Sequence, residues 1–98
     1  MTMTPVLLAA DEALLFVTDV GHDAAVHALS LDEALRRIGV TVARRQVVAL
    51  AQAPQLGARW HVRVTPCLVL DTGSRQIQLP GDPAQLDARR LEQALAQR

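Results

Sequence analysis

The chain has only one cysteine, Cys67, and it has no lysine, tyrosine or asparagine. A single thiol excludes an internal disulfide and any zinc or iron–sulfur site built from several cysteines. The three histidines, His22, His27 and His61, lack the spacing of a metal site. His22 and His27 are five residues apart, which places them on different faces of a helix, and His61 lies in another element. We therefore expect no metal and no cofactor, and a reducing cytoplasm as the compartment.

Excess charge and long apolar runs are also missing. Ten basic residues balance ten acidic residues, so the net charge is zero. Surfaces that bind nucleic acid or anionic membranes carry an excess of positive charge. No apolar run approaches the roughly 20 residues of a membrane span. With 50% hydrophobic and 20% charged residues, the chain is predicted to fold, with neither nucleic acid nor membrane as its partner.

The 98 residues suffice for one domain. Residues 1–12 show no clear period, and we expect them to form a flexible N-terminal lead to a single domain over residues 13–98. That domain opens with Ala13–Val17, an unbroken apolar run. Continuous hydrophobicity is typical of a central strand that is covered on both faces.

A helix is predicted to follow this strand. Asp23 can cap it, and Gly39 can end it in the left-handed conformation that glycine favours. Its expected apolar stripe consists of Ala24, Ala28, Leu31, Leu35 and Ile38. A second strand over residues 40–50 completes a βαβ unit, whose crossover makes the two strands parallel.

The second half predicts a short helix and a β-hairpin. Pro54 begins a helical segment over residues 54–60. The apolar run Cys67–Leu70 and the alternating run Gln76–Leu79 are separated by a turn, which is typical of an antiparallel hairpin.

A last helix is predicted directly after the hairpin. Asp82 is its expected cap, Pro83 its first residue, and Gln85 stands three residues after the cap. Its expected apolar stripe is Ala84, Ala88, Leu91 and Leu95.

This order, βαβ, a short helix and then ββα, predicts an α/β fold of the thioredoxin-like kind. The sheet should have four strands of mixed direction, with helices on both faces. The segment Arg59–Pro66, which reads Arg-Trp-His-Val-Arg-Val-Thr-Pro, resembles the thioredoxin segment that leads into its cis-proline. The resemblance implies that the Thr65–Pro66 bond is cis.

Thioredoxin chemistry requires two cysteines, separated by two residues, at the start of the first helix. The corresponding window here is Val20-Gly21-His22-Asp23, so Val20 and Asp23 hold the two cysteine positions. Neither side chain is a thiol. We therefore expect no dithiol oxidoreductase activity and no catalytic residue.

Within this superfamily, four short segments are similar to the KaiB family of clock proteins. They are Val26–Leu29, Ala53–Leu56, Thr65–Pro66 with Leu68, and Gly81–Asp82. The resemblance implies a non-catalytic module that docks on a larger protein, a KaiC-type ATPase or a sensor histidine kinase. Its expected partner-binding residues are Val20, Gly21, His22, Asp23, Thr65 and Pro66, together with the first helix. The open edge over residues 76–79 and the small size also favour a homo-oligomer.

Two alternatives remain open at the level of sequence. Cys67 is a possible reactive thiol, and the chain would then be a mono-thiol redox or glutathione-binding protein. The chain could also be an assembly chaperone, as some thioredoxin-like hydrogenase maturation proteins that lack the cysteine pair are. Burial of Cys67 would separate the binding module from the thiol enzyme.

Members of the KaiB family also switch the second half of the chain between two folds. The local signals here agree with one of them. A turn between two β-patterned runs predicts a hairpin, and Asp82–Gln85 predicts a helix start after it. We therefore expect the thioredoxin-like state, with a strand near residues 75–80 and a helix near residues 84–95.

Overall fold

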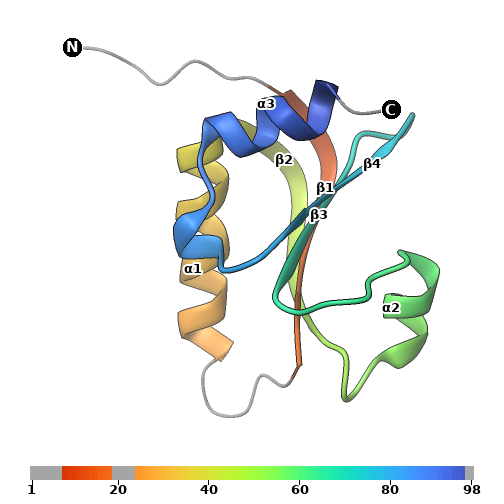
Figure 1. The fold of residues 1–98 in the computed structure, drawn as a ribbon. Coiled ribbons are helices and arrows are strands. Elements are labelled where there is room, and N and C mark those ends of the chain that lie inside the picture. The colour runs from red at the N-terminus through yellow and green to blue at the C-terminus, as the bar shows by residue number, and fades with distance from the viewer. Residues whose placement is uncertain (1–7, 19–23, 97–98) are drawn as a thin grey trace.

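The computed structural model describes residues 8–18 and 24–96. Four strands form one sheet in the order β2-β1-β3-β4, with β1 and β2 parallel and the other two pairs antiparallel (Figure 1). The elements are β1 (Leu8–Val17), α1 (Ala24–Ile38), β2 (Val40–Ala49), α2 (Pro54–Arg59), β3 (Cys67–Asp71), β4 (Gln76–Pro80), the 3-10 helix η1 (Pro83–Gln85) and α3 (Ala88–Ala96). The predicted thioredoxin-like α/β architecture is confirmed.

Helices cover both faces of the sheet. α1 and α3 lie on one face and α2 lies on the other (Figure 1). Successive residues of β1 alternate between the two cores: Leu15 packs with Leu35 and Leu91, whereas Phe16 packs with Trp60. This alternation explains the unbroken apolar run, because a strand covered on both faces needs apolar side chains at every position.

β1 begins at Leu8, five residues earlier than the sequence predicts. Residues 8–12, expected in the N-terminal lead, are therefore strand. Leu8 pairs with Val40 of β2, and Glu12 pairs with Arg44, whose Nε lies 3.5 Å from the Glu12 carboxylate. Alanine and acidic residues have low β-propensity, so this stretch shows no local strand signal. The ten-residue parallel partner decides its conformation.

The last helix begins later than the sequence predicts. Asp82 does cap a helix, but that helix is only η1, and Leu86 after it is extended and buried. α3 starts at Ala88, and Asp87 Oδ1 accepts a hydrogen bond from Arg90 N at 3.0 Å. Ala84, expected in the apolar stripe, is exposed, and Leu86 occupies the core in its place.

Arg37 of α1 holds this break in place. Its Nη2 donates to the carbonyl of Pro83 at 2.6 Å, and its Nε donates to the carbonyl of Leu86 at 2.8 Å. One guanidinium therefore binds two carbonyls on either side of the break, and Pro83 O also accepts a hydrogen bond from Leu86 N at 3.2 Å. The tertiary contact between α1 and η1 overrides the local capping signal.

The second half is in the expected state. Gln76–Pro80 is a strand and Ala88–Ala96 is a helix, which confirms the prediction of the thioredoxin-like arrangement. None of the helices in the described part of the chain is long and apolar enough to cross a membrane.

Candidate functional site

The Thr65–Pro66 turn lies at the end of the sheet where β1 finishes (Figure 1). Its peptide bond is cis. The hydroxyls of Thr65 and Thr18 lie 2.6 Å apart, and Gly81 N donates to the carbonyl of Pro66 at 2.9 Å. These two contacts tie the turn to the end of β1 and to the residue that follows β4.

The end of α2 sets the path of the backbone toward the Thr65–Pro66 turn. His61 adopts a left-handed conformation with φ of +57°, and its N–H donates to Ala58 O. Val62 N donates to Gly57 O at 2.9 Å. This pair of bonds is the Schellman motif, in which the left-handed position is usually glycine. Gln78 of β4 fastens the motif by donating its side-chain Nε2 to Trp60 O at 2.6 Å.

Three large apolar side chains of the described residues are exposed: Val26, Leu29 and Val64, at 60%, 57% and 57%. Val26 and Leu29 lie three residues apart on α1, and Val64 directly precedes the Thr65–Pro66 turn. The first half of α1 and this turn lie toward the same end of the sheet (Figure 1). We call Val26, Leu29, Val64, Thr65 and Pro66 the docking end.

Sequence reasoning included the first helix in the expected binding surface, but it did not single out Val26, Leu29 or Val64. Of the predicted stripe of α1, Leu31, Leu35 and Ile38 are buried, whereas Ala28 is exposed. Val26 and Leu29 are apolar but fall outside that stripe. This departure from the helical periodicity was the signal that could have identified them as exposed. Val26–Leu29 is also one of the four segments that resemble the KaiB family.

Thr65 and Pro66, two of the six expected partner-binding residues, are half-buried at the docking end, and their role in binding stays a prediction. The other four expected residues, Val20, Gly21, His22 and Asp23, lie outside the described residues.

Cys67 lies at the first position of β3 and is buried, with 1% of its surface exposed. It packs in the core beneath α2, among Phe16, Trp60 and Val69. Burial raises the pKa of the Cys67 thiol, and a hydrogen bond with the backbone of Leu79 opposes the shift. A buried thiol with a raised pKa is a poor nucleophile at neutral pH.

No metal site was found in residues 8–18 and 24–96, where no group of three or more histidine, cysteine or acidic side chains is placed to hold an ion. The docking end offers three exposed apolar side chains and the hydroxyl of Thr65, which contacts the hydroxyl of Thr18.

No family model matches the chain, and no curated protein matches it. Among solved structures, the chain is similar to the N-terminal domain of SasA from Synechococcus elongatus, a KaiB-like thioredoxin-fold domain. The identity is 25% and the TM-score 0.54, and the match covers 100% of this chain and 95% of that domain. The likeness supports a thioredoxin-fold interaction or regulatory module.

Proposed function

We propose that this KaiB-like thioredoxin-fold domain is a regulatory module that binds a larger protein through its docking end and catalyses no reaction. The observation that carries the proposal is the exposure of Val26, Leu29 and Val64. Fully burying a valine or leucine side chain is worth about 1.5–3 kcal/mol, and these three side chains, 57–60% exposed, would each contribute a part of that to a complex. A partner that covers all three gains enough to offset part of the entropy lost on association.

A KaiC-type ATPase or a sensor histidine kinase is the proposed partner. This part of the proposal rests on the resemblance to the KaiB family at Val26–Leu29 and Thr65–Pro66, together with the likeness to the SasA domain. The burial of Cys67 counts against the mono-thiol enzyme. An assembly chaperone would use a similar surface, and co-purification with an immature enzyme in place of these partners would favour it.

The proposal is tested by placing a charge on the docking end. In Leu29→Glu and Val64→Glu, we expect the affinity for the ATPase or kinase, measured by calorimetry, to fall about tenfold or more. Ser74→Glu is the matched control, because Ser74 is exposed in the β3–β4 turn at the opposite end of the sheet (Figure 1). Equal losses in all three variants, or undiminished binding in the first two, would contradict the proposal.

A further inference from the structure

β4 forms one edge of the sheet, with β3 on its only paired side within the described chain. In an antiparallel pair, the backbone groups of alternate residues point toward the partner and away from it. Thr72 N donates to Arg75 O at 3.0 Å, and Gly81 N donates to Pro66 O at 2.9 Å. These bonds lie at the two ends of the hairpin, and both indicate the same set of β4 residues whose backbone groups point toward β3.

The two bonds therefore identify the backbone groups of β4 that β3 leaves unpaired. Ile77 and Leu79 direct their N–H and C=O toward β3, whereas Gln76, Gln78 and Pro80 direct theirs outward. Proline has no N–H, so the outward ladder stops at Pro80. An added strand would therefore find a donor and an acceptor at both Gln76 and Gln78.

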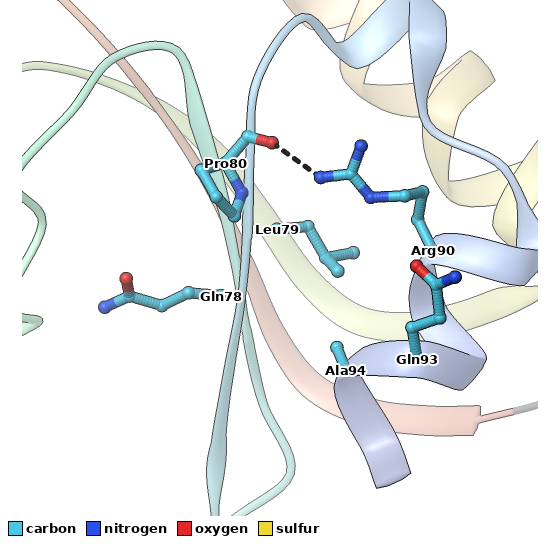
Figure 2. Close-up of a pocket in the computed structure, with 6 residues that line it drawn as sticks. All are labelled: Gln78, Leu79, Pro80, Arg90, Gln93 and Ala94. Carbon is cyan, nitrogen blue, oxygen red and sulfur yellow. Dashed lines mark hydrogen bonds between the residues drawn. The ribbon is translucent and has the colours of Figure 1, made fainter. Parts of the chain in front are cut away.

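A groove of about 370 Å³ lies between β4 and α3 (Figure 2). Its lining consists of Gln78, Leu79, Pro80, Arg90, Gln93 and Ala94. Leu79 points from β4 toward α3, and Arg90 and Gln93 stand on the opposite wall (Figure 2). The groove thus combines an open strand edge with two long polar side chains, beside the buried Leu79.

The charge in the groove comes from Arg90. Its Nη2 donates to Pro80 O at 3.4 Å, and no carboxylate among residues 8–18 and 24–96 forms an ion pair with it. The N-terminus of α3 is already capped by the Asp87 carboxylate, so the Arg90 side chain is the group that would bind an anion in the groove. The guanidinium can bind a carboxylate through two parallel hydrogen bonds.

We propose that this groove binds an extended peptide segment, which pairs with the free edge of β4 and places an acidic side chain on Arg90. Main-chain hydrogen bonds at Gln76 and Gln78 supply the pairing, and Arg90 supplies the selectivity. The site shares no residue with the docking end, so it gives the module a second partner-binding surface, specific for acidic extended segments.

The test uses two end-blocked peptides, Val-Glu-Val-Glu-Val and Val-Lys-Val-Lys-Val, with amide hydrogen exchange followed by NMR. We expect the acidic peptide to slow exchange at Gln76 and Gln78 by about tenfold at saturation. Exchange at Ile77 and Leu79 should change little, because those amides already pair with β3. An acidic peptide that is N-methylated on its pairing edge should lose binding, with no change to the protein.

Two neighbouring arginines provide a matched pair of variants. Arg89 and Arg90 are both exposed in the first turn of α3, but only Arg90 lines the groove. Arg90→Glu should weaken binding of the acidic peptide about tenfold, whereas Arg89→Glu should change it by less than about twofold. Any general effect of charge reversal on α3 is shared by the two variants.

Four results would overturn the proposal. They are equal binding of the lysine peptide, equal effects of Arg89→Glu and Arg90→Glu, no binding of the acidic peptide at millimolar concentration, and protection of Gln76 and Gln78 that rises with protein concentration in the absence of peptide. The last would mean that a second copy of the chain occupies the edge.

Discussion

His61 is the non-glycine residue with positive φ among the described residues. The left-handed conformation costs an L-residue about 1–2 kcal/mol, because the Cβ approaches a carbonyl oxygen. The Schellman bonds and the Gln78 side chain hold it there. Strain of this kind persists where surrounding contacts over-determine the backbone. Here those contacts direct the chain from α2 toward the docking end.

Replacing His61 with glycine should therefore stabilise the protein. We expect His61→Gly to raise the free energy of unfolding by about 0.5–1 kcal/mol, measured by urea denaturation. His61→Val should lower it, because a β-branched residue tolerates positive φ poorly. A loss of stability in His61→Gly as large as that in His61→Val would contradict this account of the α2 end.

The thiol of Cys67 makes the stability of the protein depend on pH. Burial raises the pKa of its thiol in the folded state, so the folded protein holds that proton more tightly than the unfolded chain does. The resulting stabilisation is complete below the pKa of the unfolded thiol, near 8.5, and is lost as pH rises through the folded value. The chain contains no lysine or tyrosine, so no other side chain titrates in this window.

The free energy of unfolding should thus fall as the pH rises above about 8.5, with a slope of at most about 1.4 kcal/mol per pH unit. Denaturation across this range should show the decline in the wild-type protein. Cys67→Ala should have a lower free energy of unfolding at pH 7, because the substitution leaves a cavity. The free energy of unfolding of this variant should change little with pH. A parallel decline in the variant would show that the thiol is not the cause.

At the scale of elements, the C-terminal segment contains two caps where the sequence suggests one. Asp82 Oδ1 accepts a hydrogen bond from Ala84 N at 3.0 Å, and Asp87 Oδ1 accepts one from Arg90 N at 3.0 Å. The first cap begins a three-residue 3-10 helix and the second begins the nine-residue α3. The longer helix also buries Leu91 in the core.

The two caps should therefore contribute unequally to stability. We expect Asp87→Ala to lower the free energy of unfolding by about 1 kcal/mol, and Asp82→Ala by about half of that. Thermal or chemical denaturation of the two variants compares them directly, since both aspartates are exposed. A larger loss in Asp82→Ala would instead support the single helix that the sequence predicts.

At the scale of the whole molecule, the sheet has two unpaired edges within the described chain. β2 forms one edge with ten residues and β4 forms the other with five. Pro80 limits the pairing window of β4, whereas β2 contains no proline. The longer edge offers more backbone hydrogen bonds to a second copy.

The sequence predicts a homo-oligomer from the open edge over residues 76–79, but from the lengths of the two edges we expect the oligomer to form through β2 instead, leaving β4 free. Light scattering over a concentration series should show a species heavier than the 10.6 kDa monomer. Gln76→Pro, which removes an outward N–H of β4, should leave the mass unchanged. A monomer at every concentration would contradict the oligomer, and dissociation in Gln76→Pro would place the interface on β4.

Local sequence signals determined most of the fold. The apolar runs Ala13–Val17 and Cys67–Leu70 gave the central strands, and Gly39 marked the end of α1 with φ of +79°. The lack of a cysteine pair removed dithiol chemistry. These features depend on residues close together in the chain, so the sequence alone carries them.

Tertiary contacts decided the rest. β1 extends to Leu8 because β2 lies alongside it, and α3 begins at Ala88 because Leu86 enters the core and Arg37 binds the break. The docking end follows from packing, because Leu31, Leu35 and Ile38 of α1 lie in the core, whereas Val26 and Leu29 are exposed. Such contacts join residues far apart in the chain, and no local period or capping pattern encodes them.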